Sequence, residues 1–118
     1  MKQIMPQEIE VWYIIPSIRK EFAFFMYRKG LSQKEIAKNL GVTEPAVSQY
    51  LKQKRANKIH FDKNTMREIE ISVEKILKDS NIMSETQRIC RLLMKNLTIC
   101  KLHQSLDPNI PKKCDLCM

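Results

Sequence analysis

Four cysteines lie within the last 29 residues of this 118-residue chain, spaced as C-x9-C-x13-C-x2-C: Cys90, Cys100, Cys114 and Cys117. In a reducing compartment, clustered thiols are metal ligands or redox groups more often than disulfides. Four cysteine thiolates can hold a zinc ion or an iron–sulfur cluster. The spacing therefore predicts a tail that binds a metal or a cluster.

His103 adds a second possible set of ligands. The pair Cys100-x2-His103 is separated by ten residues from the pair Cys114-x2-Cys117. Two short knuckles of this kind are typical of a zinc site. In this arrangement Cys90 remains as a buried thiol on its helix.

The two ligand sets place different demands on the backbone. On one continuous helix, Cys90 and Cys100 would lie about 15 Å apart, whereas zinc lies only ~2.3 Å from each sulfur ligand. A site made of all four cysteines therefore requires a break, which we expect near Asn96, with a helix restarting at Thr98. The site that uses His103 needs no break, and spacing alone leaves both sets open.

The elements that position these residues are predicted to be helices. Only two glycines and an aromatic fraction of 7% disfavour a fold of many strands and tight turns. Apolar residues instead recur every three or four positions. Asp62 or Asn64 is expected to cap one helix, and a capping box at 84–87 to open the next. The expected helices cover residues 6–15, 17–29, 33–40, 44–54, 62–79 and a segment from 84. Pro16 is expected to interrupt the first helix and so to separate it from the second. The tail from 105 is expected to be irregular.

The first half of the chain has residues that typically begin and end helices at the expected boundaries. Gly30 is expected to end one helix. Ser32 and Glu35 have the spacing of a capping box for the next helix. Gly41 is expected to end that helix, and Thr43 to cap the one that follows.

Positive charge is concentrated in the same region. The chain has 21 Lys and Arg against 13 Asp and Glu, a formal net charge of +8. Residues 1–60 carry +6, and the segment 28–58 alone accounts for it. A local basic excess favours an anionic partner, most simply nucleic acid.

Residues 33–52 resemble the helix-turn-helix of the Cro and phage-repressor (XRE-like) type. Ala37 is small where the second helix packs over the first, and Gly41 occupies the turn. The positions where the helices meet one another are apolar: Ile36, Leu40, Val42, Val47 and Tyr50.

The resemblance implies which side chains face DNA, because the second helix of this motif enters the major groove. Gln49 has the amide needed for a bidentate pair with adenine, and Lys34 and Lys38 are further candidates for phosphate contacts. The full predicted DNA-binding set is Gln33, Thr43, Glu44, Pro45, Ala46, Ser48, Gln49, Lys52, Lys54 and Arg55.

A homodimer on a palindromic operator is expected. One such helix reads only a few base pairs, and dimers of this motif read two half-sites ~34 Å apart on double-stranded DNA. The predicted helix at 62–79 has a wide apolar stripe. The stripe either forms the dimer contact or packs on its own N-terminal domain.

Nearly the whole chain is similar to a group of small archaeal predicted transcription regulators. The shared features are IIPSIR at 14–19, AVSQYL at 46–51, the Lys54-Arg55 pair and a tail of the form ICR…C-x-L-H…C-x-x-C. The chain departs from the group at Ala56-Asn57, where relatives often carry glycine. The resemblance implies a cysteine-ligated iron–sulfur cluster of the [4Fe–4S] type, held by Cys90, Cys100, Cys114 and Cys117, that senses iron or redox state.

We therefore expect an all-α protein with a helix-turn-helix DNA-binding domain at 1–58 and a helical dimerisation and cysteine-rich region at 59–118. It is expected to be a cytoplasmic transcription regulator, because no apolar run approaches a membrane span and MKQIMPQEIE lacks the apolar core of a signal peptide. An enzyme is not expected. The Cys114-x2-Cys117 pair lacks the βαβ setting of a thioredoxin-type site, and only two histidines are present.

Overall fold

The structure, a computed structural model, describes residues 5–52, 59–79, 81–95 and 98–106. Every regular element in this part of the chain is helical, which confirms the predicted all-α class. The elements are α1 (Pro6–Ile9), the π-helix η1 (Glu10–Ile14), α2 (Ile15–Arg28), α3 (Gln33–Leu40), α4 (Glu44–Leu51), α5 (Lys63–Lys78), α6 (Ile82–Lys95) and α7 (Thr98–Leu106).

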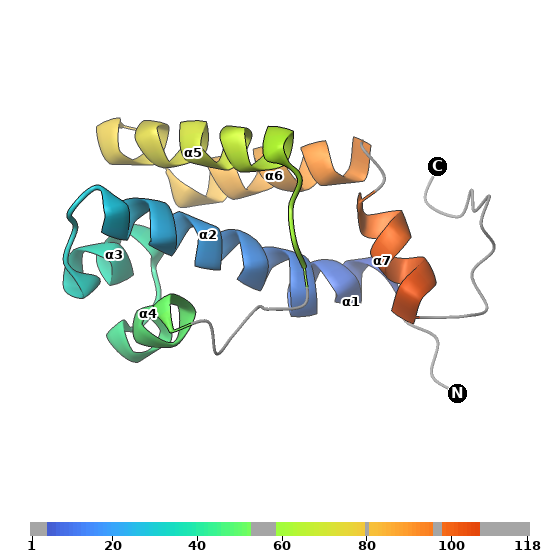
Figure 1. Cartoon of the computed structure of the whole chain (residues 1–118), viewed down its shortest axis with the longest axis horizontal. Helices are drawn as coiled ribbons and strands as arrows, with labels where there is room; N and C mark the ends of the chain where they lie inside the picture. The colour runs from blue at the N-terminus through green and yellow to red at the C-terminus, as the bar shows by residue number, and fades with distance from the viewer. Residues whose placement is uncertain (1–4, 53–58, 80, 96–97, 107–118) are drawn as a thin grey trace.

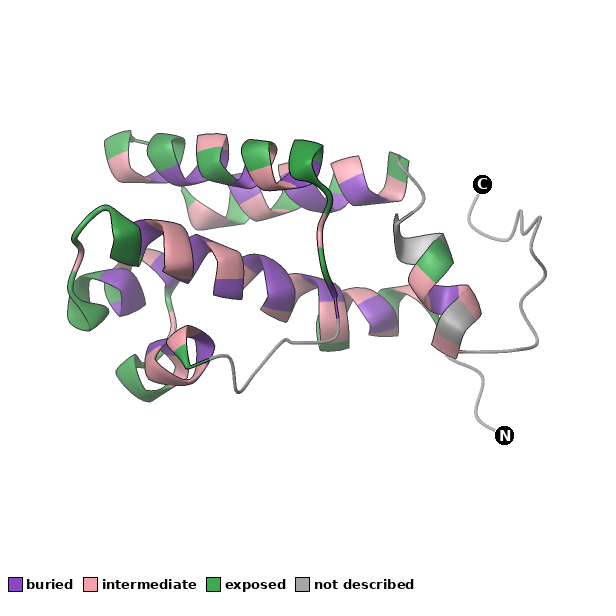
Figure 2. Cartoon of the chain, viewed as in Figure 1, coloured by how far each residue is buried: buried purple, intermediate pink, exposed green. Residues whose placement is uncertain are grey.

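Helix α2 is the centre of the arrangement. It contacts α3 and α4 at one end of the molecule and is covered along one face by α5 and α6, while α7 lies against α1 (Figure 1). Figure 2 shows the buried positions on the sides of the helices that face one another. The fully buried side chains of α2 that form the centre of the core are Ile18, Phe22, Ala23 and Met26.

Pro16 does not interrupt the N-terminal helix, so this prediction was wrong. A proline in a regular α-helix lacks a hydrogen-bond donor and clashes with the carbonyl group four residues earlier. Here the preceding turn widens into η1, in which the N–H of Ile15 donates to the carbonyl oxygen of Glu10. Pro16 then sits in the first turn of α2. The π turn gives the ring room, and the helix continues without a break.

The predicted caps around α3 and α4 are confirmed. The hydroxyl of Ser32 accepts from the N–H of Glu35 at 3.2 Å, and the Glu35 carboxylate accepts in return from the N–H of Ser32 at 3.1 Å. Thr43 accepts from the N–H of Ala46 at 3.2 Å. Gly30 has φ +95°, in the left-handed region expected of a residue just after a helix.

The caps of the second half follow the prediction in one case and not in the other. Asp62 caps α5, because its carboxylate accepts from the N–H of Thr65 at 2.8 Å. Helix α6, in contrast, begins at Ile82 and not after Ser84. The side chain of Asn81 accepts from the N–H of Ser84 at 2.8 Å, so Asn81 takes the capping position directly before the helix.

The apolar stripe of α5 packs inside its own chain. Ile69 and Val73 are fully buried, and α5 contacts both α2 and α6. Of the two uses considered for this stripe, packing against the N-terminal domain is therefore the one observed.

Arg88 joins α5 to α6 through a set of polar contacts. It forms an ion pair with Glu68 across the two helices. It also donates to the carbonyl oxygen of Glu68 at 2.9 Å and to the hydroxyl of Ser72 at 2.6 Å. Glu85, one turn before it on α6, accepts from its Nε at 3.2 Å. None of the described helices is both long and apolar enough to cross a membrane.

Candidate nucleic-acid interface

Helices α3 and α4 are held in a fixed relation by the turn between them. Gly41 has φ +68°, a left-handed conformation that favours glycine. Ala37 is only 6% exposed where the two helices meet. The apolar positions named from the sequence lie inward as predicted: Ile36, Leu40, Val47 and Tyr50 are buried, and Val42 is partly buried against the core.

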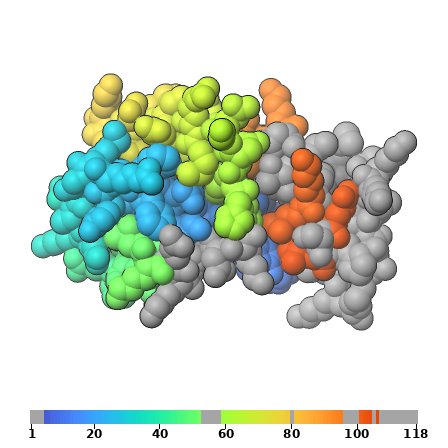
Figure 3. Space-filling model, viewed as in Figure 1, coloured from blue at the N-terminus to red at the C-terminus, as the bar shows by residue number. Residues whose placement is uncertain are grey.

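The outer face of α4 carries the residues predicted to meet DNA. Thr43, Glu44 and Pro45 are exposed at its N-terminus, and Lys52 is exposed just beyond its end. Ala46, Ser48 and Gln49 are half-buried along the helix. The hydroxyl of Thr43 caps the helix through Ala46, which limits its freedom to contact a base. Figure 3 shows α3 and α4 together at one end of the molecular surface.

Helix α3 adds polar and basic groups next to this face. Gln33, Lys34 and Lys38 are all exposed. Glu35 is exposed too, but its carboxylate is held by Ser32. The hydrogen bond from the backbone of Ser32 keeps the pKa of Glu35 below its usual value. Glu35 is thereby directed to the helix terminus, and the exposed lysines give the surface a net positive charge.

This arrangement can bind a duplex in two ways. Uncapped N–H groups at a helix N-terminus and lysine ammonium groups attract phosphate irrespective of sequence. The amide of Gln49 and the hydroxyl of Ser48 have the donors and acceptors needed to read base edges. Lys54 and Arg55, predicted to contact phosphate, lie outside the described residues.

The predicted metal ligands fall partly within the described residues. Cys114 and Cys117 lie outside the described residues, and of Cys100 the structure gives only its place in α7. Cys90 is on α6, which ends at Lys95, and α7 begins at Thr98. Cys90 and Cys100 are therefore on separate helices, as a site made of four cysteines requires.

Cys90 and His103 are both buried, with 8% and 4% of their surfaces exposed. Burial raises the pKa of the Cys90 thiol to about 11; the Glu10 carboxylate adds to this shift and Arg91 opposes it. Cys90 also belongs to the buried hydrophobic core. Among the described side chains, no group of three His, Cys, Asp or Glu residues is placed to hold a metal ion.

Two features were missed in the sequence analysis. Lys20 is 7% exposed on α2, although lysine is rarely buried. Lys20 lies between Ser17 and Phe22 on the side of α2 that packs into the core, and this position in the sequence could have indicated its burial. The contacts of Arg88 were also missed. They join residues that are 16 and 20 positions apart, and no local pattern marks such pairs.

Comparison with known proteins agrees with the geometry of α3 and α4. Residues 26–57 match the family model of the helix-turn-helix, HTH_3. No curated protein and no solved structure matches the chain. The chain therefore carries a helix-turn-helix domain of the XRE/Cro type. This is a family of DNA-binding regulators and not of enzymes, in line with the expectation from the sequence.

Proposed function

We propose that this protein is a sequence-specific regulator of transcription that binds double-stranded DNA in the cytoplasm. The observation that carries the proposal is the polar outer face of α4, which Gly41 and Ala37 hold at a fixed angle to α3. A recognition helix presented in this way can enter a major groove with its N-terminal end first.

The side chains divide into two groups by their chemistry. Gln49 and Ser48 are proposed to read bases, and Ala46 to contact a thymine methyl group. Thr43, Glu44 and Pro45 would approach the groove at the helix start. The residues proposed to hold phosphate are Gln33, Lys34, Lys38, Lys52, Lys54 and Arg55, and these would set affinity and its salt dependence.

A homodimer is proposed to read a palindromic operator. Selection of bound duplexes from a random pool should enrich a sequence with two related half-sites centred ~34 Å apart. Sedimentation equilibrium of the free protein should give twice the mass of the chain. A pool that stays random after repeated selection would refute sequence-specific binding. Enrichment of one unrepeated site would refute the dimer alone.

The C-terminal cysteines are proposed to hold an iron–sulfur cluster of the [4Fe–4S] type that reports iron or redox state to the DNA-binding domain. The ligands would be Cys90, Cys100, Cys114 and Cys117, and the cluster would supply one-electron redox chemistry. The separation of α6 from α7 between Cys90 and Cys100 supports this set.

A structural zinc ion on Cys100, His103, Cys114 and Cys117 is the second candidate. The burial of Cys90 favours it, because Cys90 is only 8% exposed and packs within the hydrophobic core. In this arrangement Cys90 is part of the core, and the metal has no sensing role.

Variants at two positions, Cys90 and His103, purified without oxygen, separate these candidates. With the cluster, iron and acid-labile sulfide are present, Cys90→Ser loses them, and His103→Asn keeps them. With zinc, one zinc ion per chain is present, Cys90→Ala keeps it, and His103→Asn loses it. Circular dichroism controls for folding of the buried His103 site. The sensing role is refuted if operator affinity at fixed salt is the same with and without the cluster.

A further inference from the structure

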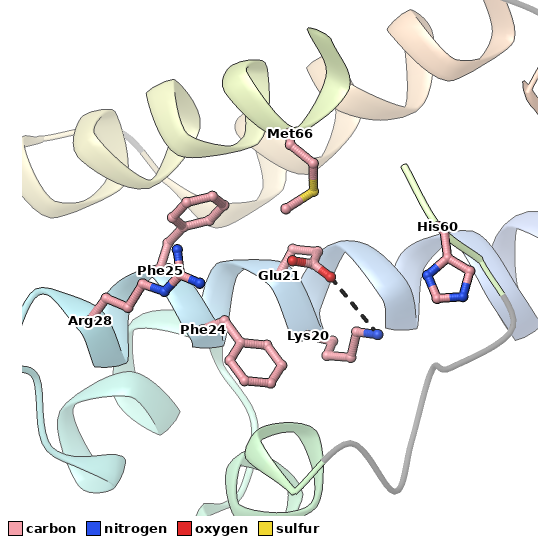
Figure 4. Close-up of a pocket in the computed structure, with 7 residues that line it drawn as sticks. All are labelled: Lys20, Glu21, Phe24, Phe25, Arg28, His60 and Met66. Atoms are coloured by element: carbon pink, nitrogen blue, oxygen red, sulfur yellow. Dashed lines mark ion pairs between the residues drawn. The ribbon is translucent and has the colours of Figure 1, made fainter. Parts of the chain in front are cut away.

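A cavity of about 280 Å³ lies between α2 and the chain that leads into α5 (Figure 4). It is distant in sequence from the cysteines, and the DNA-facing set uses none of its residues. Its lining combines cationic and apolar side chains: Lys20, Glu21, Phe24, Phe25, Arg28, His60 and Met66.

Helix α2 supplies most of this lining from a single face. Residues 20, 21, 24, 25 and 28 follow the helical repeat, so they lie along one side of α2. His60 and Met66 approach from the segment before α5 and from its first turn. The cavity is thus built by the packing of two segments that are about 40 residues apart in the chain.

The charges around the cavity are unbalanced. Lys20 is almost fully buried, and its ammonium group lies 3.8 Å from the carboxylate of Glu21. Burial raises the pKa of Glu21 despite the nearby charges of Lys20, Arg28 and His60. The lining thus has one carboxylate, Glu21, against two cationic side chains, Lys20 and Arg28. This net positive charge beside a largely buried ion pair favours a further anion.

Apolar surface lies next to this charge. Phe24, Phe25 and Met66 are partly buried, and the guanidinium group of Arg28 lies over the Phe25 ring, 5.8 Å from its centre. Small-molecule sites typically pair such apolar walls with a few charged groups that orient the ligand. Inorganic ions would leave the apolar walls unfilled, whereas uncharged hydrocarbons would leave the net positive charge of the lining unbalanced.

We propose that this cavity binds a small organic carboxylate with an apolar body. The positive charges of Lys20 and Arg28 would attract the carboxylate group, and the apolar body would pack on Phe24, Phe25 and Met66. The volume is at the lower limit for small-molecule pockets, which are typically ~300–1,000 Å³. The ligand is therefore about the size of benzoate.

Because of the position of the cavity, ligand binding there would be coupled to DNA binding, a consequence that rests on the proposed function. Helix α2 packs directly on α3 and α4. The matched helix-turn-helix region begins at Met26, two residues before Arg28 of the cavity. A ligand that fixes α2 against the start of α5 would change operator affinity, and by linkage DNA would change ligand affinity by the same factor.

Binding is tested on the free protein, so its outcome does not depend on DNA. Benzoate and hexanoate are titrated while the methyl signal of Met66 is followed by NMR with labelled methionine. Acetate supplies the charge without the apolar body, and benzyl alcohol supplies the ring without the charge. At least one of the two larger carboxylates should shift the Met66 signal saturably, with affinity at least tenfold above acetate and benzyl alcohol.

Variants of the lining then test the role of the charge. Lys20→Met should weaken carboxylate binding at least tenfold, while Lys78→Met, an exposed lysine of α5, should leave it unchanged. Arg28→Gln, at an exposed position, tests the same site if Lys20→Met fails to fold. The proposed site is refuted if neither larger carboxylate gives a saturable shift. It is also refuted if Lys20→Met and Arg28→Gln both bind the carboxylate as tightly as the wild-type protein does. Equal ligand affinity with and without operator DNA overturns only the coupling.

Discussion

The backbone N–H of Val42 donates to the carbonyl oxygen of Ala37 at 3.1 Å, and this hydrogen bond closes the turn between the two helices of the DNA-binding motif. It forms only because Gly41, between them, has φ +68°. The angle between α3 and α4, and so the presentation of the recognition face, depends on this one left-handed residue.

Gly41→Ala should lower the free energy of unfolding by about 1–2 kcal/mol, the cost of a Cβ in the left-handed region. The cost comes from the backbone and not from crowding, because no atom lies within 4 Å of the position that a Cβ would take. Urea unfolding measures the change. Gly41→Asn should cost less, since asparagine tolerates this conformation better. Equal stability of Ala, Asn and wild-type proteins would contradict the argument.

Gln49→Ala should weaken binding to the selected operator by about 1–3 kcal/mol and leave binding to random duplexes nearly unchanged. The reason is that a pair with a base edge is lost, while the phosphate contacts remain. Competition binding at one salt concentration measures both values. Gln87→Ala, an exposed glutamine on α6, is the matched control. An equal loss on random DNA would instead place Gln49 on phosphate.

Arg88→Met should destabilise the fold by about 1–3 kcal/mol, because hydrogen bonds to charged groups are lost between α5 and α6. The substitution leaves Glu68 and the hydroxyl of Ser72 without their partner. Thermal and urea unfolding measure the change. Arg91→Met, an exposed neighbour on the same helix, should fall within about 0.5 kcal/mol of wild type. Similar stability of the two variants would show that the network contributes little.

The Cys90 thiol should ionise only near pH 11 in a variant with Cys100, Cys114 and Cys117 replaced by serine. An unperturbed thiol ionises near pH ~8.5. The folded protein therefore holds the proton longer than the unfolded chain, and this contribution to stability is complete below pH ~8.5 and lost as pH rises toward 11. Thiolate absorbance measures the ionisation, and comparison with the further Cys90→Ser variant isolates its effect on unfolding. Ionisation near pH 8.5 would show that Cys90 is accessible to water.

Local patterns were sufficient to predict the DNA-binding motif. The capping pairs Ser32–Glu35 and Thr43–Ala46 join residues three positions apart, so their spacing is visible in the sequence. The same holds for Gly41, whose left-handed backbone is a property of one residue and its neighbours. The helical repeat of apolar residues also gave the correct inward faces of α3, α4 and α5.

The sequence by itself therefore determined the helical class, the two helices of the motif and which of their side chains face outward. The tertiary structure decided what no local pattern contains. It placed the α5 stripe against α2 and α6, widened the turn before Pro16, and buried Cys90 and Lys20. Burial and partner choice depend on contacts between residues far apart in the chain, which arise only when the helices pack together.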